Sequence, residues 1–102
     1  MNHQKNIKEM ARHAAKAEAM LKQMANANRL MILCKLVEGE ETVGKLVAEV
    51  GLSQSAVSQH LMKMKAAKLV RAEKRGQQVY YSLASGDVTE ILKTLHRIYC
   101  AE

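Results

Sequence analysis

Apolar positions recur with helical periodicity over much of this chain, and the pattern is clearest at about residues 53–66. Val57, Leu61 and Met64 fall on one side of a helix there, which Ser53 can cap. The opposite side carries hydroxyl, amide and ammonium groups, from Ser55, Ser58, Gln59 and Lys63. Because such groups can hydrogen-bond to base edges in the DNA major groove, the pattern predicts a DNA-reading helix.

Four further helices are predicted from apolar spacing and from residues that begin or end helices. They cover about residues 5–23, a segment from Asn26 or Asn28 to about Glu38, residues 43–50, and about residues 88–100. Thr42 is the expected N-cap of the third helix and Asp87 that of the last. Gly39 is expected to end the second helix, and Gly51 supplies the turn before the reading helix.

The predicted core is aliphatic, because the chain has three Tyr and neither Phe nor Trp. In the second helix the expected core residues are Leu30, Leu33, Leu36 and Val37. In the last helix the apolar side consists of Val88, Ile91, Leu92, Leu95 and Ile98. The chain contains no proline, which leaves long helices uninterrupted.

The first predicted helix has a narrow apolar seam with a 3-4 spacing. Its members are Ile7, Met10, Ala14, Ala17, Leu21 and Met24. The seam either packs on its own domain or pairs with a second copy of the chain. We favour a dimer, because a terminal amphipathic helix has few partners in so small a fold.

A basic hairpin follows the reading helix. Strands at about 69–74 and 78–83 flank Arg75-Gly76-Gln77, a turn-forming segment. The predicted fold is therefore mainly α with a small β-hairpin, in the order α-α-α-α-β-β-α. A helix-turn-helix followed by such a basic wing is typical of a single winged helix-turn-helix domain, here covering residues 1–102.

Charge is concentrated where the reading helix and wing are predicted. The chain has 16 basic and 10 acidic residues, a net charge of +6. Residues 53–79 hold six basic residues and one acidic residue, so about five of those charges lie in this quarter of the chain. This distribution favours a polyanionic partner, namely double-stranded DNA.

Other classes of protein fit the sequence less well. The longest apolar run, Leu30–Cys34, is too short to span a membrane, and no secretory signal is visible, so a cytoplasmic protein is expected. No Gly-rich phosphate loop is present, and Ser58 and His60, two apart on a helix, do not face each other. An enzyme is not predicted, and neither is a cofactor.

Three motifs together make the chain similar to a known family. NANRLMIL, LSQSAVSQHL and RGQQVYYSL, in this order, resemble the ArsR/SmtB family of bacterial transcriptional repressors. The resemblance covers about residues 18–100 and implies a homodimer formed through the first and last helices. It also implies binding to an imperfect inverted repeat at a promoter.

The resemblance assigns base reading to four residues of the reading helix: Gln54, Ser55, Ser58 and Gln59. The remaining expected DNA contacts are His60, Lys63, Arg75 and Gln77. His60 lies at the edge of the reading face, where it either touches phosphate or packs beneath the helix. Ser53 is expected to cap the helix rather than to read bases.

Many members of this family sense metals, but this sequence lacks their best-known cysteine box. The corresponding segment reads EETVGKLVAEV and contains no cysteine. Asp87 and His96 are present, without the second His of the site in the last helix that the family also uses. Cys34, Cys100 and His96 are one ligand short of a closed zinc site, so no metal site is predicted unless a partner chain or His13 contributes.

Two cysteines remain, Cys34 in the second helix and Cys100 at the end of the last. A free cysteine is often only a small buried hydrophobic residue. His96 lies four positions before Cys100 on the same helical face, and a protonated His there would favour the reactive thiolate. This arrangement resembles the persulfide- and redox-sensing branch of the family, the BigR, SqrR and HlyU type.

That second resemblance implies that reactive sulfur species or oxidants join Cys34 and Cys100 through a disulfide or a polysulfide bridge and so release the promoter. Two alternatives remain open at this point. One is a metal-responsive repressor of the same fold, and the other is a winged-helix protein-interaction module that does not bind DNA.

Overall fold

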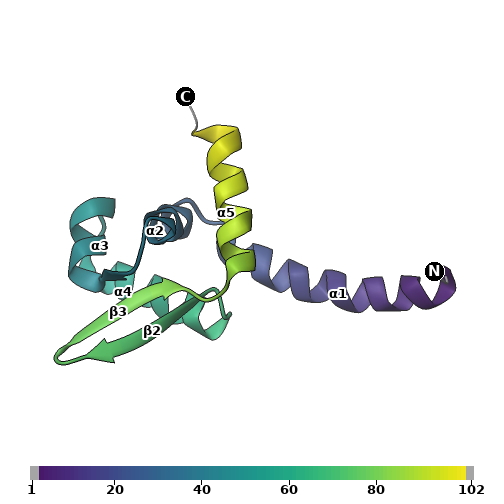
Figure 1. Ribbon diagram of the computed structural model, residues 1–102, viewed down its shortest axis with the longest axis horizontal. Helices are drawn as coiled ribbons and strands as arrows, with labels where there is room; N and C mark the ends of the chain where they lie inside the picture. The colour runs from purple at the N-terminus through teal and green to yellow at the C-terminus, as the bar shows by residue number, and fades with distance from the viewer. Residues whose placement is uncertain (1–2, 101–102) are drawn as a thin grey trace.

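The computed structural model describes residues 3–100, and the side chains from residue 6 onward (Figure 1). Within this range the chain forms five helices and three short strands. They are α1 (His3–Met24), α2 (Ala27–Val37), β1 (Glu41–Thr42), α3 (Val43–Val50), α4 (Gln54–Ala66), β2 (Val70–Arg75), β3 (Gln78–Leu83) and α5 (Gly86–Tyr99). The predicted order of helices and hairpin is confirmed, with one added strand.

Three of the predicted helix caps are confirmed. The Asn26 side chain accepts a hydrogen bond from the Arg29 N–H at 3.0 Å, which decides between Asn26 and Asn28 as the start of α2. Thr42 and Ser53 cap α3 and α4 in the same way, at 3.3 and 3.1 Å. Gly51 ends α3 in the left-handed region at φ 74°, as a tight turn between two helices requires.

The prediction that Asp87 caps the last helix is wrong. Ser85 is the N-cap of α5, and its hydroxyl accepts from the Val88 N–H at 3.3 Å. Ser85 has the extended backbone that an N-cap needs, whereas Asp87 already lies within the first turn. There its carboxylate still interacts favourably with the positive end of the helix.

The sheet contains a strand that the sequence pattern did not predict. Glu41 and Thr42 pair with Tyr81 and Tyr80 of β3, so the antiparallel order is β1-β3-β2. The hairpin β2-β3 runs in register from Val70 opposite Leu83 to Arg75 opposite Gln78. Because β1 directly precedes α3, this pairing fixes the base of the wing against the helix-turn-helix.

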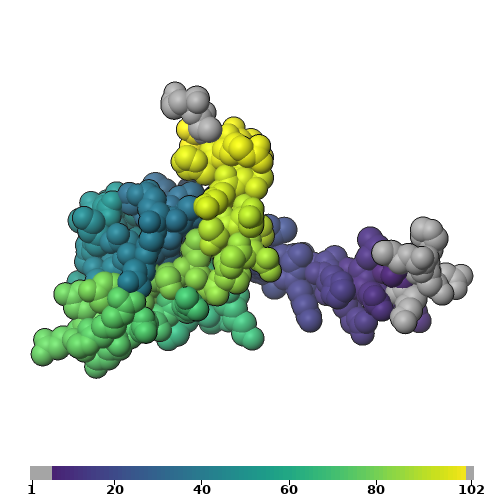
Figure 2. Space-filling view, in the orientation of Figure 1, coloured from purple at the N-terminus to yellow at the C-terminus, as the bar shows by residue number. Residues whose placement is uncertain are grey.

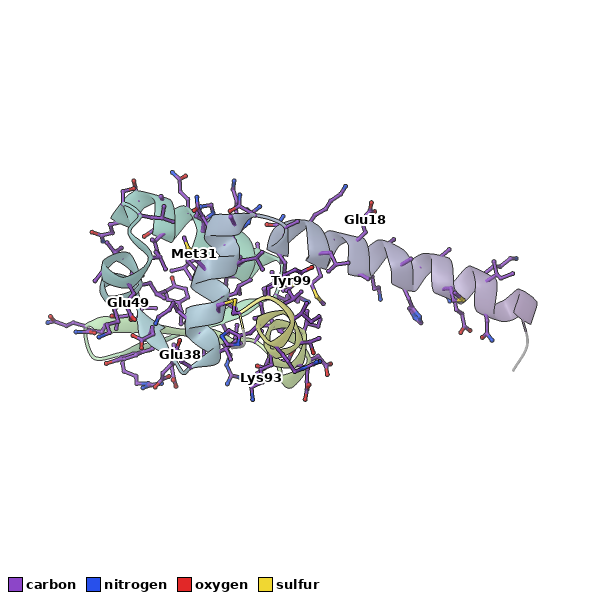
Figure 3. All side chains as sticks on the ribbon, turned by 90° about the horizontal axis from the view of Figure 1, so that it is seen from above. Glu18, Met31, Glu38, Glu49, Lys93 and Tyr99 are labelled. Atoms are coloured by element: carbon purple, nitrogen blue, oxygen red, sulfur yellow. The ribbon has the colours of Figure 1, made fainter. Side chains whose placement is uncertain are left out.

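The core is aliphatic, as predicted. On α4, Val57, Leu61 and Met64 are fully buried. On α2, Leu33 and Leu36 are buried, but Leu30 and Val37 are only partly buried. Ile32 is fully buried and was missed by the sequence prediction. The cause is that α2 lies between α3 and α5, so that it is covered on more than one side (Figure 3).

Helix α1 extends away from the rest of the molecule (Figure 2). Of its predicted seam, Met24 is buried in the core of its own domain. Ile7 and Met10 each expose 64% of their surface, and Leu21 exposes 53%. The seam is therefore divided, with its C-terminal end inside the domain and the rest uncovered. Among the described residues, no helix is long and apolar enough to cross a membrane.

Candidate functional site

The predicted reading face of α4 is open to solvent. Gln54, Ser55, Gln59 and Lys63 are exposed, and Ser58 is partly exposed. The Ser53 and Ser55 hydroxyls lie 3.3 Å apart at the start of the helix, and Ser53 is engaged as the cap. The face opposite Val57 and Leu61 thus presents amide, hydroxyl and ammonium groups that have few partners within the protein.

His60 lies at the edge of this face and is half-buried. Its Nδ1 atom is enclosed and has no hydrogen-bond partner among the side chains and backbone that the structure describes. Burial, and then the nearby positive charges of Arg29 and Lys63, lower the pKa of His60. The imidazole is therefore mainly neutral near pH 7, which favours packing beneath the helix over attraction to a phosphate.

The wing holds Arg75 in a network of its own. Its guanidinium donates to both carboxylate oxygens of Glu40 and to Glu73, and it stacks over the Tyr80 ring at 4.5 Å. The hydrogen bonds from Arg75 lower the pKa of Glu40, and those to Glu40 and Glu73 raise the pKa of Arg75. Gln77, in the turn of the wing, is exposed. The sequence prediction gave Arg75 as a DNA contact and did not include its ion pairs with Glu40 and Glu73.

Cys34 and Cys100 line one pocket of about 510 Å³. The pocket lies where α2, α5 and the end of α3 meet, and its walls are mainly apolar. Its other lining residues are Leu30, Met31, Lys35, Glu49, Val50, Leu95, His96 and Tyr99. Figure 3 shows Met31 and Tyr99 on neighbouring helices. Two thiols that lie 66 positions apart in the chain are thus brought to the same site.

The two thiols differ in access. Both are free in this structure, with Cys34 half-buried and Cys100 exposed. Burial, and then the neighbouring Cys100, raise the pKa of Cys34. His96 lines the same pocket, and its carbonyl accepts the Cys100 N–H at 2.8 Å where α5 ends. A reagent from solvent therefore reaches Cys100 more readily than Cys34.

One wall of the pocket is an ion pair that joins two helices. Lys35 of α2 lies 2.7 Å from Glu49 of α3 and 3.4 Å from Glu38. The hydrogen bond from Lys35 lowers the pKa of Glu49, and both groups are charged at neutral pH. This pair was not predicted, because the partners come from different helices. It connects the residue next to Cys34 directly to the first helix of the helix-turn-helix.

Metal ligands do not gather in the part of the chain that the structure describes. No three His, Cys, Asp or Glu side chains from residues 6–100 lie close enough together to hold a metal ion. Cys34, Cys100 and His96 share the pocket but do not form such a group. His13 lies on the exposed surface of α1.

Comparison with known proteins agrees with this geometry. The profile of the bacterial regulatory proteins of the arsR family matches residues 26–72, which run from the cap of α2 into β2. The transcriptional activator HlyU of Vibrio cholerae is 46% identical over 93% of this chain and 88% of its own length. A biofilm growth-associated repressor of Xylella fastidiosa is 31% identical over 92% of this chain and 82% of its own.

Solved structures show the same fold. Reduced HlyU from V. cholerae superposes with a TM-score of 0.87 at 46% identity, covering 92% of this chain and 99% of that one. The transcriptional repressor BigR from X. fastidiosa gives 0.83 at 29% identity over the full length of both chains. These relatives are named as transcriptional regulators, not enzymes. With its open reading helix and its basic wing, this chain is a winged helix-turn-helix transcriptional regulator that belongs to the arsR family.

Proposed function

We propose that this protein is a homodimeric transcriptional repressor whose affinity for operator DNA is switched by reaction of Cys34 and Cys100 with reactive sulfur species or oxidants. The observation that carries the proposal is the shared pocket of the two thiols. The names of its relatives include both a repressor and an activator. Repression is the simpler output, because a bound dimer blocks a promoter without further contacts.

The order of reaction follows from access. Thiol exchange proceeds by thiolate attack, so an exposed thiol reacts before an enclosed one. Cys100 is exposed and reacts first, and Cys34 then closes the bridge. In a disulfide the two thiols give two protons and two electrons to the oxidant. In a longer bridge, each cysteine thiol takes one sulfur atom from a glutathione persulfide, which leaves as glutathione. The two cysteine persulfides then join as a trisulfide with loss of hydrogen sulfide.

Dimerisation is supported by the uncovered apolar surfaces of α1 and α5. On α1 these are Ile7 and Met10, and on α5 they are Ile98 and Tyr99, which expose 59% and 80% of their surface. Large apolar side chains exposed on two terminal helices favour an interaction with a second apolar surface. A structural relative from Mycobacterium bovis, with a TM-score of 0.80 at 28% identity, is described as a homodimeric winged helix-turn-helix DNA-binding domain.

The bridge would act on DNA binding through the helices that carry the thiols. A bond between Cys34 and Cys100 draws the end of α5, part of the proposed dimer contact, towards α2. Helix α2 is tied to α3 by Lys35 and Glu49, and α3 precedes the reading helix. Because a dimer reads two half-sites about one helical turn apart, a small change in the spacing of the reading helices weakens both contacts.

The test compares wild-type protein with Cys34→Ser and Cys100→Ser on duplexes selected by the wild type from a random library. Each protein is treated with glutathione persulfide, glutathione disulfide or peroxide, and its DNA binding is then measured by fluorescence anisotropy. The wild type should release DNA, and neither variant should. Mass spectrometry should show two hydrogens lost, or whole sulfur atoms gained, between the two cysteines.

Two outcomes would contradict the proposal. Release that persists in either serine variant would exclude the two-thiol switch. Release of the reduced wild type by zinc or copper, with no response to any of the three thiol reagents, would instead favour a metal-responsive regulator.

A further inference from the structure

Met62 of α4 is a large apolar side chain that does not contribute to the core. It exposes 70% of its surface, while the core side of the same helix is filled by Val57, Leu61 and Met64. The other strongly exposed large apolar side chains of the described residues lie on α1, α2 and α5, except Val79 on the wing. Met62 therefore lies outside the surfaces that the proposed dimer would cover on α1 and α5.

The position of Met62 on the helix places it on the reading face. Helical residues advance by about 100° each, so Met62, seven positions after Ser55, points within about 20° of Ser55. It also follows Gln59 by three positions, which makes the two neighbours on the helix surface. All three are exposed. A homeodomain uses the same spacing of i, i+3, i+4 and i+7 to read bases along its helix.

The charge around Met62 identifies the partner of this face. Helix α4 contains no acidic residue. Lys63, Lys65 and Lys68 lie beside and after Met62 and are exposed. A lone apolar side chain among lysines does not suit a protein interface, whose centre is depleted of charge. An apolar side chain among lysines does suit the DNA major groove. There the phosphates attract the lysines, and the base edges lie opposite the middle of the helix face.

We propose that Met62 is a specificity-determining residue that packs against the C5-methyl group of a thymine in each half-site. This proposal rests on the DNA-binding function proposed above. Thymine is the base that presents a methyl group in the major groove. The Met side chain has no hydrogen-bond donor and a flexible, polarisable thioether, so it recognises that methyl group by contact alone. Gln54, Ser55 and Gln59 would read neighbouring bases by hydrogen bonds.

The test uses full-length wild-type protein, Met62→Ala and Met62→Leu, each allowed to select duplexes from the same random library. The wild type and Met62→Leu should prefer thymine at one position of each half-site, and Met62→Ala should lose this preference. Replacing that thymine by deoxyuridine removes only the methyl group. This replacement should weaken wild-type binding by about fourfold per half-site, from the loss of one buried methyl, and should leave Met62→Ala unchanged.

Lys63→Ala is the matched control, because Lys63 is the exposed cation next to Met62 and is expected to contact a phosphate rather than a methyl group. It should weaken binding to the thymine and deoxyuridine duplexes equally and make binding less dependent on salt. The role of Met62 would be overturned if Met62→Ala selected the same sites as the wild type, or if deoxyuridine weakened both proteins equally. If the wild type enriched no duplex at all, the DNA-reading function itself would fail, and this proposal with it.

Discussion

The guanidinium of Arg75 holds the carboxylate of Glu40, 35 positions earlier in the chain, through a two-pronged ion pair. In this bidentate pair, Arg75 Nη1 donates to Glu40 Oε1 at 2.8 Å, and Arg75 Nη2 donates to Glu40 Oε2. Because Glu73 also accepts from Arg75, two carboxylates offset one cation on the wing. The wing therefore presents less positive charge than its count of basic residues suggests.

We predict that Glu40→Gln tightens DNA binding. Without the Glu40 carboxylate, Arg75 keeps only Glu73 as an acidic partner and can approach a phosphate more easily. Each added phosphate contact steepens the slope of log K against log salt by about 0.9. Fluorescence anisotropy with a selected duplex, at salt concentrations from about 50 to 200 mM, measures this slope. Glu90→Gln, which removes an equal charge from exposed α5, is the control. An identical slope in both variants would show that Glu40 does not restrain Arg75.

We predict that Met10→Glu weakens dimerisation without unfolding the domain. Met10 is 64% exposed in a single chain, so the substitution costs little there. In a dimer it would bury a carboxylate and lose an apolar contact, which together weaken association by more than about tenfold. Analytical ultracentrifugation measures association, and circular dichroism checks the fold. Arg12→Glu, on the opposite side of α1, is the control, and equal dissociation of the two variants would argue against the seam.

We predict that His60 makes the protein less stable in mild acid. Its pKa is lowered in the folded state, so the unfolded chain takes up more protons as the pH falls. Stability is therefore full above the unfolded value of about 6.5 and decreases as the pH falls through it. Urea unfolding at pH 7 and pH 5 should show a larger loss for the wild type than for His60→Gln. Equal losses would mean that the imidazole is hydrated in the folded protein.

We predict opposite effects for alanine at two glycines of the helix-turn-helix. Gly51 has a φ of 74°, where a side chain is strained, so Gly51→Ala should destabilise the fold by about 1–2 kcal/mol. Gly44 lies within α3, and no atom lies within 4 Å of an added Cβ, so Gly44→Ala should stabilise it by roughly 0.5–1 kcal/mol. Thermal unfolding of the two variants tests both signs. A stabilising Gly51→Ala would mean that the turn can change its conformation.

Much of the fold could be predicted because its signals are local. The caps at Asn26, Thr42 and Ser53 and the turn at Gly51 depend on residues within four positions of one another. The buried stripe of α4 follows from helical periodicity alone. The error at the start of α5 was also local, since Ser85 and Asp87 are both good caps and only the backbone at each position distinguishes them.

Contacts between distant segments could not be read from the chain. Strand β1 has two residues, and it exists because Tyr80 and Tyr81 offer it backbone partners. The sequence alone predicts the reading face of α4 and gives Cys34 and Cys100 as candidate sensing thiols. Both predictions depend on helical spacing and side-chain chemistry, which are properties of the chain itself. Packing of α2 between α3 and α5 decides that both thiols enter one pocket and that Lys35 meets Glu49. The sheet order β1-β3-β2 brings Glu40, next to β1, to Arg75 at the end of β2. Those relationships depend on the distance between segments after folding, which no local pattern encodes.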